Sequence, residues 1–165
     1  MDRDDDKQMS ARQGRCSCGA VTYALAAAPL FVHACHCRDC QRHTGSAFVI
    51  NAMVLSADLQ VITGELAPWP APAAKGAKHF IHRCAQCQSA VWSSYGGKKT
   101  AMVYLRVATL ERPEELPPSA HIFTRSKLPW VGLPKNVPAY KTWYDREKTW
   151  PPESLARRKA AAART

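Results

Sequence analysis

The sequence lacks the long apolar runs that mark membrane proteins. No segment approaches the about 18 consecutive apolar residues of a transmembrane helix. Residues 1–7 are charged and precede no apolar stretch, so a secretory signal peptide is not expected. Acidic residues are scarce, with 13 against 23 basic ones. We therefore expect a soluble, cytoplasmic protein with one domain, because 165 residues suffice for a single hydrophobic core.

The excess of basic residues gives a net charge of +10 that is spread along the chain. Residues 11–140 carry +8, and residues 141–165 carry +4. Spread positive charge favours anionic small molecules or loose association with polyanions. No known nucleic-acid recognition module accompanies it, so specific nucleic-acid binding is not expected. A non-enzymatic, zinc-stabilised module that engages a polyanion or a protein partner remains the alternative to an enzyme.

Short alternating segments bounded by glycine and proline predict a mainly β fold. One short helical turn is expected at residues 38–44, ended by Gly45, and a helix at residues 153–163. The proline- and alanine-rich residues 67–76 are expected to form an exposed loop. Strands are expected at residues 20–25, 30–34, 47–54, 59–64, 78–83, 90–95, 101–107 and 121–127.

Seven cysteines are the strongest functional signal in the sequence. In a chain without a signal peptide, clustered cysteines indicate metal binding rather than disulfides. The odd number supports this interpretation, because complete pairing would leave one thiol over. The cysteines are Cys16, Cys18, Cys35, Cys37, Cys40, Cys84 and Cys87.

Two cysteine pairs have the spacing of a closed metal site. Cys84 and Cys87 are separated by two residues, so both thiolates can face one ion from a single turn. Cys16 and Cys18, followed by a glycine, can do the same at shorter spacing. Together the pairs would supply four sulfurs to a tetrahedral zinc, which would stabilise the fold rather than react.

The remaining cysteines, Cys35, Cys37 and Cys40, lie within six residues. Three protein ligands with an open fourth position are typical of a catalytic zinc that binds water or a substrate atom. A thiol is the obvious substrate, since zinc lowers the pKa of a bound thiol. His36 could be the fourth ligand, but in an extended segment it would point away from its neighbours. A thiol redox sensor built on these cysteines is a further alternative.

Other groupings of the cysteines stay open at this point. Cys35 and Cys37 could join Cys84 and Cys87 in one site, although this would split a compact triplet. Some of the cysteines could instead be small buried hydrophobic residues. Seven cysteines in this pattern make that interpretation the weaker one.

Charged and aromatic residues flank the cysteines without a settled role. Arg38 and Arg42 could bind a carboxylate or remain solvated. Asp39 could orient a histidine or cap the helical turn that follows it. Arg125 and Lys127, near Trp130, have the same ambiguity as the other two basic residues. Histidines near the cysteines are expected to be supporting or surface residues rather than ligands: His33, His43, His79 and His82.

This pattern of cysteines and glycines resembles the glutathione-dependent formaldehyde-activating enzyme (GFA) family, which includes centromere protein V. The resemblance covers about residues 12–145. It rests on Gly14-x-Cys16-x-Cys18-Gly19, Cys35-His36-Cys37-x-x-Cys40 with Gly45 and Phe48, Cys84-x-x-Cys87, and the late segment His121-Ile122-Phe123, Ser126-Lys127 and Pro129-Trp130.

The resemblance implies an Mss4-like, zinc-clasped β fold with short helical turns and two zinc ions per chain. It also implies carbon–sulfur lyase activity, in which glutathione and formaldehyde are joined as S-hydroxymethylglutathione. The three-ligand site is the one expected to lose its ion more readily. The family pattern assigns Cys16, Cys18, Cys84 and Cys87 to the structural zinc, and Cys35, Cys37 and Cys40 to the catalytic zinc.

The expected organisation is a tag or disordered tail at residues 1–11, a GFA-like zinc-binding domain at residues 12–150 and a basic C-terminal tail at residues 151–165 that contains the helix candidate. One position departs from the family pattern, because Gln88 stands where glycine usually follows the last cysteine. Glycine at such a turn tolerates a positive φ. We therefore expect a different local backbone at Gln88.

Overall fold

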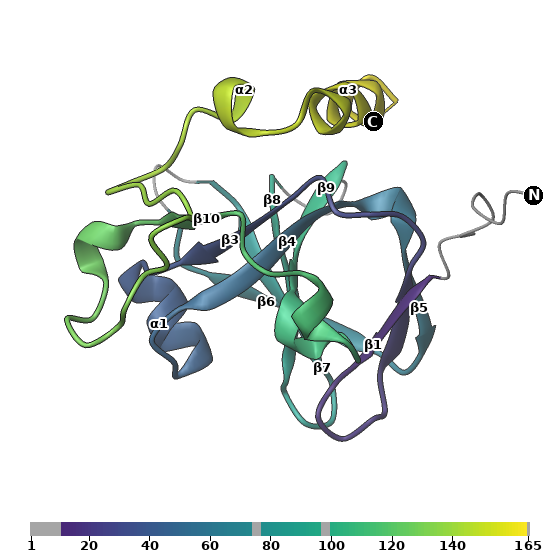
Figure 1. Cartoon of the computed structure of the whole chain (residues 1–165). Helices are drawn as coiled ribbons and strands as arrows, with labels where there is room; N and C mark the ends of the chain where they lie inside the picture. Colours follow the sequence, from purple (N-terminus) through teal and green to yellow (C-terminus); the bar gives the residue numbers. More distant parts are fainter. Residues whose placement is uncertain (1–10, 74–76, 97–99, 165) are drawn as a thin grey trace, which may run out of the picture.

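A computed structural model describes residues 11–73, 77–96 and 100–164 (Figure 1). The predicted tail at residues 1–11 lies almost entirely outside this range, as do residues 74–76 of the predicted loop. Within the described residues, ten strands form two sheets, and the mainly β prediction is confirmed. One sheet has the order β1 (Arg12–Arg15), β2 (Thr22–Leu25), β5 (Leu59–Thr63). The other has the order β10 (Ala120–Ile122), β3 (Phe31–Cys35), β4 (Val49–Leu55), β9 (Met102–Arg106), β8 (Ala90–Tyr95), β7 (His79–Cys84), β6 (Leu66–Ala71).

Strand β4 lies at the centre of the core and is buried on both faces. Ala52 and Val54 pack into one hydrophobic cluster, together with Tyr23 and Leu25 of β2. Met53 and Leu55, one residue out of step, pack into a second cluster that contains Phe31 and Tyr144. Alternate side chains of a strand point to opposite faces, so β4 joins the two clusters.

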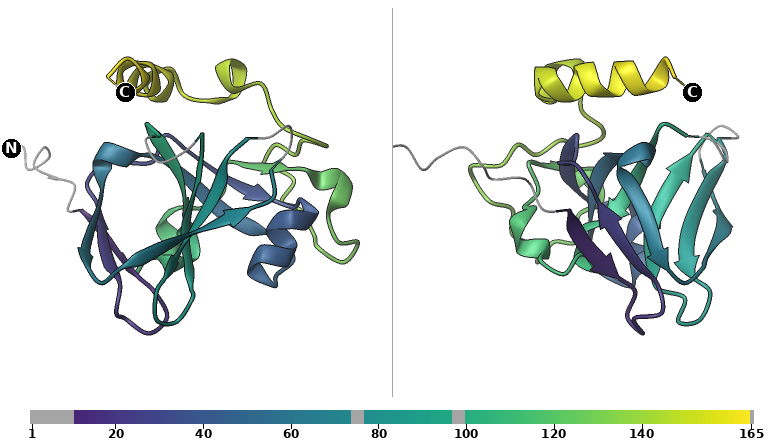
Figure 2. Two further views of the ribbon diagram at one scale, coloured as in Figure 1. Left: turned by 180° about the vertical axis from the view of Figure 1, so that it is seen from behind. Right: turned by 90° about the vertical axis from the view of Figure 1, so that its right-hand side faces the viewer.

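The C-terminal segment covers the second cluster with α2 (Arg146–Thr149) and α3 (Pro152–Ala162). Trp150 stacks on Phe31, with ring centroids 5.8 Å apart. Arg157 of α3 donates to the backbone oxygen of Ala28 at 2.9 Å and pairs with Asp58 at 3.1 Å. Figures 1 and 2 show both helices at the end of the molecule opposite the β1–β2 and β7–β8 turns. In the part of the chain that the structure describes, no helix has the length and apolar character needed to cross a membrane.

The expected loop at residues 67–76 is wrong for its first half, because β6 occupies residues 66–71. This strand is at the edge of the seven-stranded sheet and pairs with β7 along its whole length. Pro68 and Pro70 are two residues apart, so both lack an N–H on the same side of the strand. On an edge strand that side can face away from the sheet, where no donor is needed.

The expected strand at residues 121–127 is also too long. Strand β10 ends at Ile122, and residues 124–126 form a 3₁₀ turn. Phe123 adopts the left-handed region, with φ at 53°, which ends the strand. The predicted short helix at residues 38–44 is present as α1 (Arg38–Thr44), and Gly45 ends it with φ at 61°.

Gly64 connects the two sheets and leaves no room for a side chain. Its φ is +74°, and a Cβ there would collide with the backbone of Ala20 and Val21. We expect Gly64→Ala to lower the free energy of unfolding by about 3 kcal/mol, because left-handed strain and backbone displacement add together. Gly45→Ala is the matched control, with similar φ but open space, and should cost about 1 kcal/mol. Urea denaturation measures both, and equal losses would contradict this account.

Candidate metal centres

The seven cysteine thiols gather in two separate groups, and all seven are free. Within each group the sulfur atoms all lie within 4.8 Å of one another. Both groups could therefore hold a metal ion. The alternative that joins Cys35 and Cys37 to Cys84 and Cys87 is not the arrangement in the structure. The four-cysteine cluster contains Cys16, Cys18, Cys84 and Cys87, and the three-cysteine cluster contains Cys35, Cys37 and Cys40.

The four-cysteine cluster lies between the β1–β2 turn and the β7–β8 turn, which Figures 1 and 2 show side by side. The sulfur of Cys18 is 3.5 Å from that of Cys16 and 4.0 Å from that of Cys84. Sulfurs about 2.3 Å from a tetrahedral zinc are about 3.8 Å apart. The spacing of these thiols thus fits one tetrahedral ion.

Hydrogen bonds hold the two turns around the four-cysteine cluster. The backbone N–H of Val21 donates to the sulfur of Cys16 at 3.3 Å. Ser89 donates from its hydroxyl to the hydroxyl of Ser17 at 2.9 Å, and the N–H of Ser17 donates back to Ser89 at 3.3 Å. The serine pair therefore links the turns across 72 positions of sequence, next to the metal-ligand candidates.

The expectation of a different backbone at Gln88 is wrong. Gln88 has φ at 61°, the left-handed conformation that glycine would favour there. Its N–H donates to the carbonyl of Cys84 at 3.0 Å, and Arg83 donates to its carbonyl at 2.9 Å. These bonds offset the left-handed strain of a non-glycine residue, which costs about 1–2 kcal/mol.

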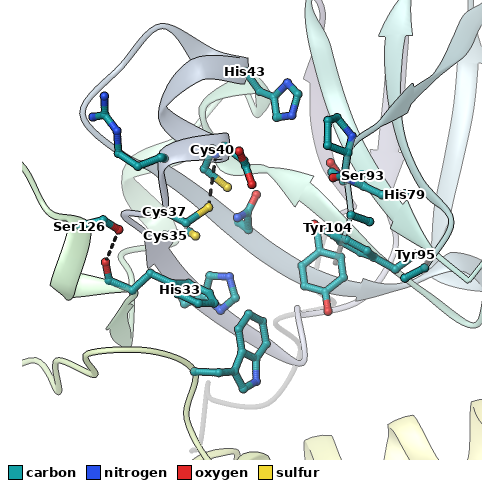
Figure 3. A pocket seen from close by; sticks show the side chains of 18 of the residues that line it. His33, Cys35, Cys37, Cys40, His43, His79, Ser93, Tyr95, Tyr104 and Ser126 are labelled. Carbon is teal, nitrogen blue, oxygen red and sulfur yellow. Dashed lines mark hydrogen bonds between the residues drawn. The ribbon is translucent and has the colours of Figure 1, made fainter. Parts of the chain in front are cut away.

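The three-cysteine cluster forms where β3 leads into α1. Cys35 is the last residue of β3 and is 4% exposed, Cys37 is the N-cap of α1, and Cys40 lies in the first turn. The N–H of Cys40 donates to the sulfur of Cys37 at 3.3 Å. The strand-to-helix transition therefore brings three thiols from six consecutive residues to one place, as Figure 3 shows.

The three thiols compete for negative charge. Hydrogen bonds from Cys35 and Cys40 lower the pKa of Cys37 to about 2. Hydrogen bonding to Cys37 and Cys40, together with burial, raises the pKa of Cys35. The bond with Cys35 lowers the pKa of Cys40, but Cys37 and burial outweigh it and raise that pKa to about 12. One thiolate is thus favoured without a cation, and a bound cation would favour all three.

Two sequence-based roles near this cluster need correction. Asp39 does not cap the helix, since Cys37 does, and Asp39 instead lies 3.7 Å from Arg42. His36 is fully buried and lies outside the group of sulfur ligands. Its Nε2 is 3.0 Å from Nδ1 of His121. The side chain of His36 therefore points away from the cluster, as alternation along an extended segment requires.

A cavity of about 760 Å³ opens beside the three-cysteine cluster. All three of its cysteines line this cavity, and Figure 3 shows Ser93, Tyr95 and Tyr104 on the side across from them. Sequence reasoning missed most of these walls, because they come from distant strands and from the C-terminal segment. The lining residues that it did not single out are Asn51, Pro72, Ala73, Ala77, Ser93, Tyr95, Tyr104, Arg106 and Trp143.

The flanking residues singled out in the sequence divide into two sets. Lining the cavity are His33, His43, His79, Arg38 and Arg125, together with Asp39, Phe123 and Ser126. Arg42, Lys127, Trp130 and His82 are not among its lining residues. Lys127 donates to the carbonyls of Leu128 and Val131, and His82 lies 3.0 Å from the hydroxyl of Ser94.

His33 shows how strongly the inner wall is shielded from water. Burial, followed by the positive charge of Arg106, lowers the pKa of His33 to about 3. Its Nδ1 lies 3.2 Å from the hydroxyl of Tyr144, and its ring meets Trp143 edge to face at 5.3 Å. The imidazole is therefore neutral near pH 7 and is fixed by residues of the C-terminal segment.

Comparisons with known proteins give one family and one structural likeness. The model of the glutathione-dependent formaldehyde-activating enzyme family matches residues 11–126. A crystal structure of a Rhodobacter sphaeroides protein is 26% identical and has a TM-score of 0.43, covering 60% of this chain and 87% of that one. No curated protein matches the sequence.

The family match includes every cysteine of both clusters. The β sheets, the short helices and the two clusters agree with the predicted Mss4-like fold, in which bound zinc would clasp the strands. From residues 11–126 the chain belongs to the glutathione-dependent formaldehyde-activating enzyme family.

Proposed function

We propose that this protein is a zinc-dependent carbon–sulfur lyase that joins a small thiol to an aldehyde and cleaves the adduct in reverse. Glutathione and formaldehyde are the expected substrates, and S-hydroxymethylglutathione is the product. In this proposal Cys16, Cys18, Cys84 and Cys87 hold a structural zinc. Cys35, Cys37 and Cys40 hold the catalytic zinc.

The observation that carries the proposal is the position of the three-cysteine cluster in the wall of the cavity. Its sulfurs converge within 4.8 Å and face a space of about 760 Å³. Pockets of about 300–1,000 Å³ suit small-molecule ligands. Three thiolates leave a tetrahedral ion one position for a substrate atom. A redox sensor would need neither this vacancy nor this volume.

The reaction itself requires one new bond and one proton transfer. The thiol sulfur bonds to the aldehyde carbon, the carbonyl electron pair moves onto oxygen, and the thiol proton ends on that oxygen. When bound, zinc lowers the pKa of a thiol and polarises a carbonyl oxygen. The aromatic walls at Tyr104 and Trp143 limit the water around the reacting atoms.

His79 is placed to carry the proton. It is 8% exposed, lines the cavity, and stacks on Tyr95 with ring centroids 4.2 Å apart. Its Nδ1 lies 3.3 Å from the carbonyl of Pro72, which can only accept a hydrogen bond. Nδ1 therefore carries the proton, which leaves a lone pair on Nε2, a buried atom without a partner in the described residues. Nε2 can take the thiol proton and return it to the adduct oxygen.

We expect His79→Gln to lower the catalysed rate about 100-fold, because general acid–base catalysis contributes at least that much in typical enzymes. His82→Gln is the matched control, since His82 is on the same strand but does not line the cavity. Exchange between formaldehyde and glutathione, followed by NMR, measures both rates. A His79→Gln rate within twofold of the wild-type rate would exclude this role.

The same exchange measurement tests the proposed function as a whole. Zinc-loaded wild-type protein should accelerate adduct formation and breakdown well above the spontaneous rate. Glutathione and formaldehyde at equilibrium give separate signals, so exchange can be followed without removing product. An exchange rate equal to the protein-free rate would overturn the assignment of these substrates.

A further inference from the structure

Arg106 is a buried cation in the inner wall of the cavity. Its side chain belongs to a residue that is 7% exposed and that lines the cavity. It donates from Nη1 to Oδ1 of Asn51 and from Nη2 to the hydroxyl of Ser93, the latter at 2.8 Å. Its Nε is buried without a partner in the described residues. A guanidinium keeps its charge in proteins, so these neutral partners leave the charge itself unbalanced.

No carboxylate balances this charge among the ion pairs of the described residues. Asp39 lines the same cavity, but it is exposed and lies 3.7 Å from Arg42. A buried charge that lacks a countercharge strongly destabilises a folded protein. The fold therefore needs a source of negative charge close to Arg106.

The sheet register points to that source. Arg106 of β9 pairs with Asn51 of β4, and Asn51 pairs with His33 of β3. Cys35 is two residues beyond His33, so its side chain is on the same face of the sheet. Burial lowers the pKa of Arg106, and negative charge at Cys40, Tyr95 and Cys35 opposes this shift. Arg106 and the three-cysteine cluster thus share one face and one cavity.

We infer that Arg106 is the countercharge of the three-cysteine metal site, a positioning residue that strengthens retention of the ion there. Three thiolates and one divalent cation carry a net charge of −1, which one guanidinium neutralises. The four-cysteine cluster lies at the two turns and has no member in this cavity. The effect of Arg106 is therefore specific to one of the two sites. This inference rests on metal binding and not on the proposed reaction.

A purely structural role makes a different prediction. Arg106 also ties β9 to β4 and β8 through Asn51 and Ser93. If those hydrogen bonds were its whole role, lysine, which lacks the planar fork, would fail as completely as a neutral residue. If charge is the role, Arg106→Lys should retain the ion and Arg106→Met should release it.

Competition with a zinc chelator tests the inference on intact, zinc-loaded protein. We expect Arg106→Met to weaken one of the two zinc ions about 10- to 100-fold, as loss of groups around a metal site typically does. Arg106→Lys should stay within about threefold of wild type. Arg125→Gln, which removes a charge from the exposed part of the cavity lining, is the matched control and should change neither ion.

The Cys37→Ser variant identifies the two ions, because it should keep only the ion of the four-cysteine cluster. Equal weakening of both ions in Arg106→Met, or of neither, would overturn the inference. Arg106→Lys keeps the test decisive even if Arg106→Met does not fold. A lysine variant that folds but loses the three-cysteine ion would also overturn it.

Discussion

Replacing Cys84 with serine is expected to remove most of the protein's folding stability. Cys84 is 1% exposed and packs with Cys16 and Val21 in a small cluster between two turns. Structural zinc in small domains contributes an apparent 10–16 kcal/mol, which is as large as the total stability of a typical domain. Loss of one ligand should therefore lower the melting temperature by at least about 15 °C.

Circular dichroism during heating measures this effect for Cys84→Ser and for wild-type protein treated with a strong chelator. Both should lose cooperative melting at similar temperatures. Ser89→Ala, which removes one hydrogen bond between the same two turns, is the control and should cost about 1 kcal/mol. A Cys84→Ser protein that melts within a few degrees of wild type would show that the four-cysteine cluster does not hold the fold together.

The same substitution at Cys37 should have the opposite result: activity is lost and the fold stays. Serine lacks the thiolate that binds zinc, so we expect the catalysed exchange rate to fall at least about 1,000-fold, a barrier increase of about 4 kcal/mol. The helix should tolerate the change, because serine is a favoured N-cap and its hydroxyl can accept from the N–H of Cys40. Stability should change by about 1 kcal/mol or less.

The pair of variants separates the two clusters. Exchange NMR gives the rate, and urea denaturation gives the free energy of unfolding, for Cys37→Ser and Cys84→Ser under the same conditions. Persistent catalysis by Cys37→Ser would exclude a catalytic role for the three-cysteine cluster. Unfolding of Cys37→Ser as severe as that of Cys84→Ser would show that both clusters are structural.

The features of the fold that could be predicted from sequence are the local ones. Strands β2, β4 and β9 have alternating or continuous apolar residues, and α1 ends at a glycine. The three-cysteine cluster comes from six consecutive residues, so its geometry depends only on a strand that turns into a helix. Such features need no knowledge of distant contacts.

What could not be predicted depends on strand order and on conformation at single residues. Pro68 and Pro70 suggest a loop until β6 is known to be an edge strand. Phe123 and Gln88 adopt positive φ although neither residue type favours it. Arg106 has no distinguishing pattern in β9, since its importance arises only when the sheet places it beside Asn51 and the cysteines.

The central claim is that the three-cysteine cluster is a separate metal site with one position open to a thiol. The most direct test is the visible spectrum of protein loaded with two Co²⁺ ions in place of zinc, recorded as glutathione is added. We expect the sulfur-to-cobalt and ligand-field bands of one ion to change, while Cys37→Ser, with only the other ion, shows no change. A wild-type spectrum that glutathione leaves unaltered would contradict the claim.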